Sequence, residues 1–353
     1  MIEPIEFNDE PRRVLIVLPT WVGDVVMATP FLDALFARFD SSEVSLLMYK
    51  HLFSILDGGP WTDTAKQIYF WNKDDTNTLV HELKAQQFDA AILLPNSFRV
   101  AWFAKKIGAK RRIGFSRDAR GWLLTDPLPV PNRRGFKFEP LPLVNYYNTF
   151  GQYLGCKTPG DAMSLFTTDE DEGSTTQRLE REGIPADATI VTLCPGANFG
   201  ASKCWHPERF AGVADELVRH QGVSVVISPG PGEEPLAERI AEAMEEKSYL
   251  LTEPCLTLGE LKSLMKQSSL LIGNDTGPRH YARAFDIPRV TIFGPTEQRW
   301  TDTSHDKETI VKVDVPCGPC QKKVCPLKER VCMDRITVQD VYEASKPYLE
   351  RRI

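Results

Sequence analysis

The segment 269–296, SLLIGNDTGPRHYARAFDIPRVTIFGPT, limits the fold more than any other part of the chain. It opens with a short apolar run that is typical of a buried strand. Small and polar residues follow, and Pro278 fits the first turn of a helix, where a missing N–H group is tolerated. A second apolar run at 289–293 completes the pattern. The order strand, turn, helix, strand predicts a βαβ unit and therefore a parallel sheet.

The polar turn of this unit lies where open α/β sheets bind ligands, at the carboxyl end of a strand. Asp275, Thr276 and Gly277 precede the expected helix, and His280 falls in its first turn. The free N–H groups and partial positive charge of a helix start suit a phosphate. The turn also fits a simple helix cap, and the two interpretations are compatible. Neither GxGxxG nor GxxxxGK[ST] occurs in the chain, so a dinucleotide fingerprint or a P-loop is not supported.

The same alternation of strands and helices runs through both halves of the chain. An acidic stretch at 158–188 interrupts it and is expected to hold a linker and one helix. With 353 residues, the length favours two domains. We therefore expect an α/β protein with two Rossmann-like domains facing each other across a cleft. The expected boundaries are 1–170, 171–336, and a terminal helix within 337–353 that packs back across the domains.

Composition indicates a soluble globular protein, with 42% hydrophobic and 25% charged residues. The acidic start lacks an apolar signal region, and no run approaches the ~20 apolar residues of a membrane span. These features predict a cytoplasmic location. The oligomeric state is not predictable from them.

The charge is uneven, although the net charge is only −6. Eleven Lys or Arg residues lie between Arg99 and Lys137, Arg120 among them, and only Asp118 and Asp126 oppose them. Such an excess fits an anionic partner, whether phosphate groups, a membrane surface or nucleic acid. It equally fits a solvated face that acidic residues elsewhere balance. Aromatic residues are not interleaved as in a groove for single-stranded nucleic acid, so we expect no nucleic-acid partner.

Two single residues stand at positions suited to chemistry. Asp24 follows the first strand and Gly23 and begins a helix, where it is either a cap or a general base. As a base it would need burial to raise its pKa from about 3.9. Lys203 follows a glycine-containing loop after the strand at 189–194, where it is either a surface lysine or a charge on a phosphate. Ser202 and the loop backbone would add hydrogen-bond donors.

Four of the eight cysteines fall within sixteen residues: Cys317, Cys320, Cys325 and Cys332. A cytoplasmic location argues against a disulfide framework. The spacing allows either a structural zinc site or reduced, packing cysteines, and the second interval is looser than a usual zinc pair. A catalytic zinc is not expected, because four thiolates leave no open position.

Beyond these single features, five motifs in order resemble glycosyltransferase family 9, the ADP-heptose:lipopolysaccharide heptosyltransferases, and most of all those of the heptosyltransferase II type. They are RVLIVLPTWVGDVVMATPFLDAL at 13–35, FDAAILLPNSFRVAW at 88–102, RRIGFSRDARGWLLT at 111–125, CPGANFGASKCWHPERFA at 194–211 and GNDTGPRHYARAFDIPRVTIFGPT at 273–296.

The resemblance implies a GT-B fold and an inverting transfer that requires no cofactor or metal. Its donor would be ADP-heptose, held by the C-terminal domain, and its acceptor heptosyl-Kdo2-lipid A of the lipopolysaccharide core. That acceptor is a phosphorylated glycolipid, which places the enzyme at the cytoplasmic face of the inner membrane. Two other functions stay open: a GT-B enzyme with another sugar nucleotide or surface-glycan acceptor, and a non-catalytic protein that binds sugar nucleotides.

The resemblance also assigns roles to residues. Asp24 matches the catalytic aspartate and Lys203 the lysine on the donor phosphates. Asp275, Thr276, Gly277 and His280 match the donor-binding turn, and Glu233 or Glu234 approximates a glutamate that contacts the ribose. The predicted acceptor-binding residues are Asn96, Ser97, Arg99 and Arg120. Pro278-Arg279 departs from the apolar pair common in the family, so Arg279 would contact a phosphate or point to solvent.

Overall fold

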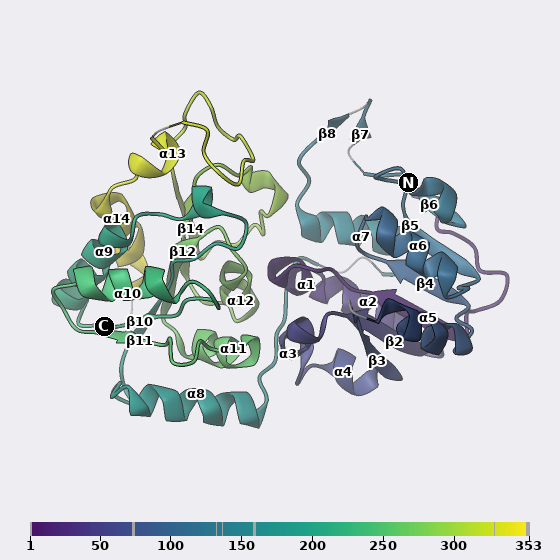
Figure 1. Cartoon of the computed structure of the whole chain (residues 1–353), viewed down its shortest axis with the longest axis horizontal. Helices are drawn as coiled ribbons and strands as arrows, with labels where there is room; N and C mark the ends of the chain where they lie inside the picture. Colours follow the sequence, from purple (N-terminus) through teal and green to yellow (C-terminus); the bar gives the residue numbers. More distant parts are fainter. Residues whose placement is uncertain are drawn as a thin grey trace. The chain divides into compact units, whose positions relative to one another are not determined.

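The computed structural model describes residues 2–72, 75–131, 133–135, 137–157, 160–327 and 329–350. The chain forms two compact units: Met1–Phe166 with Arg299–Thr303, and Thr167–Gln298 with Ser304–Ile353. Each unit has one six-stranded parallel sheet with helices on both faces, as Figure 1 shows. The predicted α/β class is therefore confirmed.

The first unit carries β1–β8 and α1–α7. Its strands are β1 (Arg13–Val17), β2 (Glu43–Met48), β3 (Gln67–Phe70), β4 (Ala90–Leu93), β5 (Arg111–Phe115), β6 (Asp126–Leu128), β7 (Arg133–Arg134) and β8 (Lys137–Phe138). Its helices are α1 (Val22–Met27), α2 (Thr29–Arg38), α3 (Phe53–Leu56), α4 (Pro60–Thr64), α5 (Thr76–Ala85), α6 (Phe98–Lys106) and α7 (Leu143–Tyr153). The antiparallel pair β7–β8 lies outside the main sheet.

The second unit repeats this plan. Its strands are β9 (Ile190–Cys194), β10 (Ser224–Ile227), β11 (Ser248–Leu250), β12 (Leu270–Asn274), β13 (Arg289–Phe293) and β14 (Glu308–Lys312). Its helices are α8 (Asp169–Arg181), α9 (Pro207–Gln221), α10 (Glu234–Ala243), α11 (Leu258–Gln267), α12 (Pro278–Ala284), α13 (Val331–Asp334) and α14 (Val338–Leu349). The acidic linker region thus supplies α8, which begins with a Thr168–Asp171 capping box. Residues 158–159 of that region lie outside the described residues.

Both sheets have the same strand order: β3-β2-β1-β4-β5-β6 in the first unit and β11-β10-β9-β12-β13-β14 in the second. This is the doubly wound order of Rossmann domains. The order reverses between β1 and β4 and between β9 and β12, and ligands bind at the carboxyl ends of the strands at this reversal. Two candidate ligand edges follow: the turns after β1 and β4, and those after β9 and β12.

Burial of apolar strand faces under helices stabilises each unit. In the first unit, α5 and α6 cover one face of the sheet, with Leu83, Phe103 and Ile107 buried among strand residues. The helices α1, α2 and α7 contact one another and belong to the other layer. In the second unit, α9, α10 and α14 pack on one face and α8, α11 and α12 form the other layer. A fully buried Leu or Phe contributes about 2 kcal/mol, so these helices fix the strand ends that carry polar residues.

The terminal helix α14 packs against α9 and against β12, β13 and β14, all within the second unit. Its face toward the sheet includes the buried Val341 and Leu349. A search for membrane spans among the described residues finds no helix that combines enough length with enough hydrophobicity to cross a bilayer.

Candidate active site

Asp24 lies in the first turn of α1, directly after the carboxyl end of β1. It is partly buried, and this burial raises the pKa of its carboxyl group to about 6. The charge of Asp24 in turn helps to raise the pKa of the buried Tyr147 on α7. The N-cap residue of α1, Trp21, makes no side-chain capping hydrogen bond, and Asp24 is the acidic residue of the first turn. The arrangement suits a general base that accepts a proton near neutral pH.

The predicted acceptor residues after β4 have different surroundings. Asn96 Oδ1 accepts hydrogen bonds from Tyr146 Oη at 3.1 Å and from Arg120 Nη2 at 3.3 Å. Ser97 caps α6 by accepting a hydrogen bond from the Val100 N–H at 3.3 Å. Its hydroxyl therefore has a structural partner, as a helix cap would.

Arg120 is fully buried, with its guanidinium bound to the backbone. It donates to the carbonyl oxygens of Phe115 and Pro95 as well as to Asn96. Burial lowers the pKa of Arg120 to about 10. The side chain thus holds the loop after β4 against β5 and has no surface to offer an acceptor. It positions Asn96, and its predicted direct contact with an acceptor stays a prediction.

Acidic neighbours balance part of the basic stretch. Four of its eleven cations pair with carboxylates: Lys110 with Asp89, Arg111 with Asp126, Arg117 with Asp118, and Arg134 with Glu139. Arg99 remains exposed, stands over the Trp71 ring and donates to Tyr49 Oη at 3.2 Å. The interpretation as a balanced face therefore accounts for a share of the charge but not for Arg99.

An exposed aromatic cluster, Phe98, Trp102 and Trp122, lies beside these cations. Phe98 stacks on Trp102 at 6.4 Å between ring centroids and contacts Trp122 at 5.9 Å. Lys105 Nζ stands over both tryptophan rings, at 5.7 and 5.5 Å. Trp122 remains 65% exposed, which is unusual for a tryptophan of a globular unit. Exposed aromatic patches of this kind mark binding surfaces.

In the second unit, Lys203 and Asp275 bridge the turns after β9 and β12. Lys203 Nζ donates to Asp275 Oδ2 at 2.6 Å and to its carbonyl oxygen at 2.8 Å. Asp275 Oδ2 also accepts from Thr296 Oγ1 at 2.8 Å, in the turn after β13. Burial alone would raise the pKa of Asp275, but the charges of Lys203 and Arg279 outweigh it and hold that pKa below its ordinary value. Two of the predicted donor residues are thus brought into direct contact.

Arg279 corrects one expectation. It neither points to solvent nor stands free for a phosphate: its side chain is 1% exposed, and its guanidinium binds Glu308 on β14 at 2.5 and 3.1 Å. Arg289 of β13 binds the same carboxylate at 2.7 Å. These two charges overcome the effect of burial and lower the pKa of Glu308 to about 2. A buried arginine needs such a partner, so Arg279 serves the interior of this unit.

Thr276, Gly277 and His280 complete the predicted donor-binding turn. Gly277 and Pro278 open α12, which is only seven residues long. His280 is buried, and burial together with the charges of Arg279 and Arg289 lowers its pKa to about 3. It is therefore neutral at physiological pH. Thr276 Oγ1 lies 3.4 Å from the carbonyl oxygen of Asn274.

Glu233 lies where the loops after β9 and β10 converge. Its Oε2 accepts a hydrogen bond from the Gly230 N–H at 2.9 Å, and a Cβ added to Gly196 would overlap its carboxylate. Gly196 is therefore required for Glu233 to occupy this place. Glu234 instead begins α10 and contacts Cys255, so Glu233 is the glutamate at the ligand edge.

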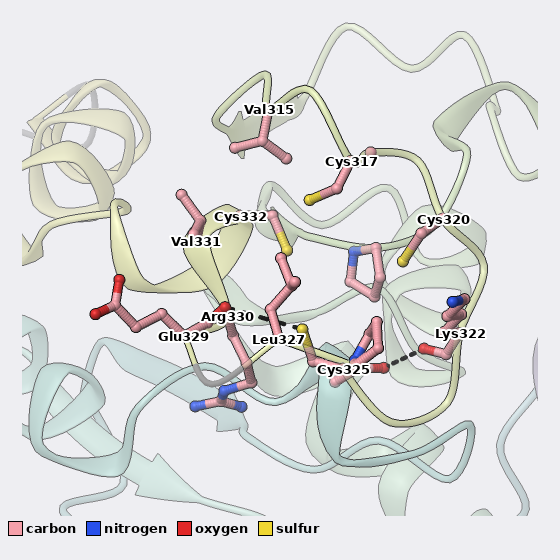
Figure 2. Close-up of a pocket in the computed structure, with 14 residues that line it drawn as sticks. Val315, Cys317, Cys320, Lys322, Cys325, Leu327, Glu329, Arg330, Val331 and Cys332 are labelled. Atoms are coloured by element: carbon pink, nitrogen blue, oxygen red, sulfur yellow. Dashed lines mark hydrogen bonds between the residues drawn. The ribbon is translucent and has the colours of Figure 1, made fainter.

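The hydroxyl of Ser202, predicted to contact a phosphate, makes its hydrogen bond inside the protein. The residue is 3% exposed, and its hydroxyl donates to the carbonyl oxygen of Lys322 at 2.6 Å, in the loop that carries Cys317, Cys320 and Cys325. That loop lines a pocket of about 150 Å³ with Cys317, Cys320, Cys325 and Cys332, as Figure 2 shows. All four thiols are free. Burial and the three neighbouring thiols raise the pKa of Cys332.

Sequence reasoning missed Asn274 as an organising residue. Its amide donates to the carbonyl oxygen of Pro195 at 2.5 Å, and its Oδ1 accepts from the Trp205 N–H at 3.1 Å. It joins the turns after β9 and β12 and so places Lys203 against Asp275. Thr296 was missed as well, although both residues lie in the segment 269–296.

Comparison with known proteins adds the family to this geometry. The model of glycosyltransferase family 9 (heptosyltransferase) matches residues 76–330. Lipooligosaccharide heptosyltransferase 2 of Haemophilus influenzae is 26% identical over 324 residues, which cover 85% of this chain and 88% of that protein.

Two solved structures align with 96% of this chain. One is a glycosyl transferase of family 9 from Veillonella parvula, with a TM-score of 0.80, 20% identity and 97% of that chain covered. The other is the E. coli ADP-heptose lps heptosyltransferase II, with a TM-score of 0.76, 21% identity and 99% of that chain covered. These likenesses show the GT-B fold. Since the family model spans more than half of its length, the chain belongs to glycosyltransferase family 9, the heptosyltransferases.

Proposed function

We propose that this glycosyltransferase moves L-glycero-D-manno-heptose from ADP-heptose to heptosyl-Kdo2-lipid A, with inversion at the anomeric carbon. The second unit holds the donor and the first unit holds the acceptor. The related E. coli protein is described as an ADP-heptose lipopolysaccharide heptosyltransferase, which supports this choice of donor and acceptor class.

The observation that carries the proposal is the state of Asp24. A carboxyl group with a pKa of about 6, at the strand reversal of a doubly wound sheet, is matched to accepting a hydroxyl proton near pH 7. A protein that only bound a sugar nucleotide would have no use for such a group. Asp24 belongs to the first unit, whereas the predicted donor residues belong to the second.

The donor contacts follow from the ligand edge of the second unit. Lys203 stabilises negative charge on the diphosphate, and the backbone at Thr276 and Gly277 adds hydrogen-bond donors. Glu233 accepts hydrogen bonds from the ribose hydroxyls. Preorganised groups of this kind typically contribute about 10²–10³-fold in rate.

The reaction balances with these groups. The acceptor hydroxyl gives its proton to the Asp24 carboxylate as its oxygen bonds to the anomeric carbon. The bond from that carbon to the diphosphate oxygen breaks, and its electron pair leaves with ADP. Base catalysis contributes about 10²–10⁴-fold. Lys203 offsets the charge on ADP, so we expect turnover without added Mg²⁺ or Mn²⁺.

The acceptor is a lipid, and the first unit offers a surface for it. Arg99 is exposed next to the loop after β4, and the exposed cluster Phe98, Trp102 and Trp122 lies beside it with Lys105. Aromatic and basic side chains together are typical of proteins that lie on an anionic bilayer. We therefore place the protein peripherally on the cytoplasmic face of the inner membrane.

The direct test is a transfer assay with purified full-length protein, ADP-heptose and heptosyl-Kdo2-lipid A, followed by mass spectrometry of the glycolipid. We expect a mass increase of one heptose and release of one ADP. The linkage, read by NMR, should show the inverted anomer. Retention at the anomeric carbon would contradict the proposed mechanism.

A panel of ADP-, UDP- and GDP-sugars in a thermal-shift assay separates the alternatives. Stabilisation by a UDP- or GDP-sugar in preference to ADP-heptose would identify a different donor. Stabilisation by ADP-heptose with no transfer to any core acceptor would instead indicate a binding protein.

A further inference from the structure

The four clustered cysteines lie in a part of the fold that the proposed transfer reaction does not use. Cys317, Cys320 and Cys325 come from the loop between β14 and α13, and Cys332 comes from α13 itself. Figure 2 shows all four around one pocket, with Val315, Leu327 and Val331 as apolar walls. Every one of the four is a free thiol. Four soft ligands from sixteen residues thus converge on one space.

The composition of this pocket selects the kind of ligand. Sulfur ligands without histidine are characteristic of tetrahedral zinc or iron sites, whereas Mg²⁺ and Ca²⁺ prefer oxygen. Lys322, Glu329 and Arg330 also line the pocket. A volume of about 150 Å³ exceeds what one ion needs, so the loop has room to contract around it.

The loop around the pocket is long and irregular. Between β14 and α13 no helix or strand is assigned among the described residues, although the interval exceeds fifteen residues. Loops of that length without secondary structure are uncommon in compact units and usually serve a function. Among the described residues, no three His, Cys, Asp or Glu side chains already stand at coordination geometry. Ligation therefore requires the thiols to approach one another within the pocket.

We propose that Cys317, Cys320, Cys325 and Cys332 bind one zinc or iron ion as a tetrathiolate site, and that this ion fixes the turn that carries Lys203. The site is structural, because four protein ligands leave no position for a substrate. The second half of this proposal rests on the donor role proposed for Lys203.

Hydrogen bonds join the cysteine loop to that turn, η3 (Ala201–Lys203), from two sides. Ser202 donates its backbone N–H to the Lys323 carbonyl oxygen at 3.2 Å and its hydroxyl to the Lys322 carbonyl oxygen at 2.6 Å. Arg330 Nη1 donates to the carbonyl oxygens of Ala201 at 3.0 Å and Cys204 at 2.7 Å.

The cysteine loop approaches the backbone at residue 200 so closely that a glycine is required there. Gly200 has φ +150°, and a Cβ there would lie 2.5 Å from the Lys323 carbonyl oxygen. Lys322 and Lys323 lie between Cys320 and Cys325, so ordering these two cysteines orders the carbonyl groups that hold Ser202. An ion at the thiols is therefore coupled to Lys203 through two short segments of backbone.

Metal content tests the site independently of any sugar. The full-length protein, expressed with zinc and iron supplied, is purified and analysed by plasma mass spectrometry. We expect about one equivalent of a single metal. Cys320→Ser should lose most of it, and Cys255→Ser, a cysteine outside the cluster, should retain it. Wild-type protein without metal, with all four thiols reactive toward Ellman's reagent, would overturn the site. Oxidation of Cys317 and Cys320 to a disulfide would overturn it too.

The coupling to the donor turn has its own measurement. The affinity for ADP, measured by calorimetry, should fall roughly tenfold in Cys320→Ser and in wild-type protein stripped of metal by a chelator. A tenfold loss corresponds to about 1.4 kcal/mol of binding free energy. The circular dichroism spectrum of both samples should be unchanged. Restoring the metal to the stripped protein should restore the affinity, which covers the case in which the variant misfolds. Unchanged ADP affinity after metal loss would refute the coupling. Bound metal without heptose transfer would refute the proposed function instead.

Discussion

At the scale of single residues, the proposed base Asp24 should set how the activity responds to pH. Because burial raises its pKa to about 6, the base is protonated below that pH, and kcat/KM should fall about tenfold per pH unit there. Asp24→Asn should lose about 10²–10⁴-fold in kcat and abolish this acid limb. The measurement is a pH–rate profile of both proteins. If the Asn variant keeps the acid limb of the profile, that limb reports the titration of another group.

The raised pKa of Asp24 also predicts how the stability of the protein depends on pH. A carboxyl group whose pKa is higher in the folded state favours folding below its unfolded pKa, and this contribution is lost as pH rises through about 6. Ionised Asp24 therefore costs about 3 kcal/mol at pH 7. Asp24→Asn should be more stable than wild type at pH 7 by about that amount. The difference should vanish at pH 4, as urea unfolding at both pH values can determine.

A further prediction concerns the effect of Lys203 on stability and on turnover. Lys203→Met leaves the buried Asp275 carboxylate without its nearest cation, which should cost about 3 kcal/mol of stability. Turnover should fall by about 10²–10³-fold. The double variant Lys203→Met with Asp275→Asn removes both charges, so it should recover stability but not turnover. Recovery of turnover in the double variant would mean that Lys203 acts only by neutralising Asp275.

At the scale of elements, the sequence predicted the central strands better than the edge strands. The strand expected at 189–194 became β9 and the apolar run at 289–293 became β13, because strands buried on both faces read as continuous apolar segments. β5, β6 and β14 were not predicted. β5 contains two arginines, and the edge strand β14 contains two charged residues, so neither reads as a continuous apolar segment.

The missed edge strand β14 explains the error at Arg279. In the sequence Glu308 lies 29 residues away, and nothing local indicates that β14 would place its carboxylate beneath α12. The site residues on strand ends were predictable because topology brings strand ends together. Buried charge partners such as Glu308, and loop contacts such as Ser202 with Lys322, depend on packing between distant segments.

The cluster of Arg279, Arg289 and Glu308 therefore joins α12, β13 and β14, and acid should weaken it. The folded pKa of Glu308, about 2, lies below its unfolded value of 4.5, so its contribution is complete above about pH 4.5 and lost as pH falls toward 2. Glu308→Gln should destabilise the protein by about 3–5 kcal/mol at pH 7 and flatten the acid limb of stability. Glu343→Gln, which breaks the exposed pair with Lys346, should change stability by less than about 1 kcal/mol. Equal effects of the two variants would contradict this role.

At the scale of the whole molecule, the two units repeat one topology but differ in surface chemistry. The first has an exposed aromatic cluster with cations beside its ligand edge, and the second has a buried ionic network beside its own. This division matches a lipid-linked acceptor on the first unit and a small, doubly charged donor on the second. The common fold alone would not distinguish these tasks.

Membrane attachment is the prediction that belongs to this scale. The full-length protein should sediment with vesicles that contain phosphatidylglycerol and much less with phosphatidylcholine vesicles, and salt should release it. Trp102→Ala with Trp122→Ala should weaken binding by roughly tenfold or more, about 1.4 kcal/mol for each tenfold step. Val324→Ala, an exposed apolar residue of the second unit, is the control and should bind as wild type does. Because the aromatic cluster is outside the donor site, the double variant should keep its affinity for ADP. Vesicle binding that survives the loss of both tryptophans would move the membrane contact to another surface and leave the cluster as a contact for the acceptor sugar.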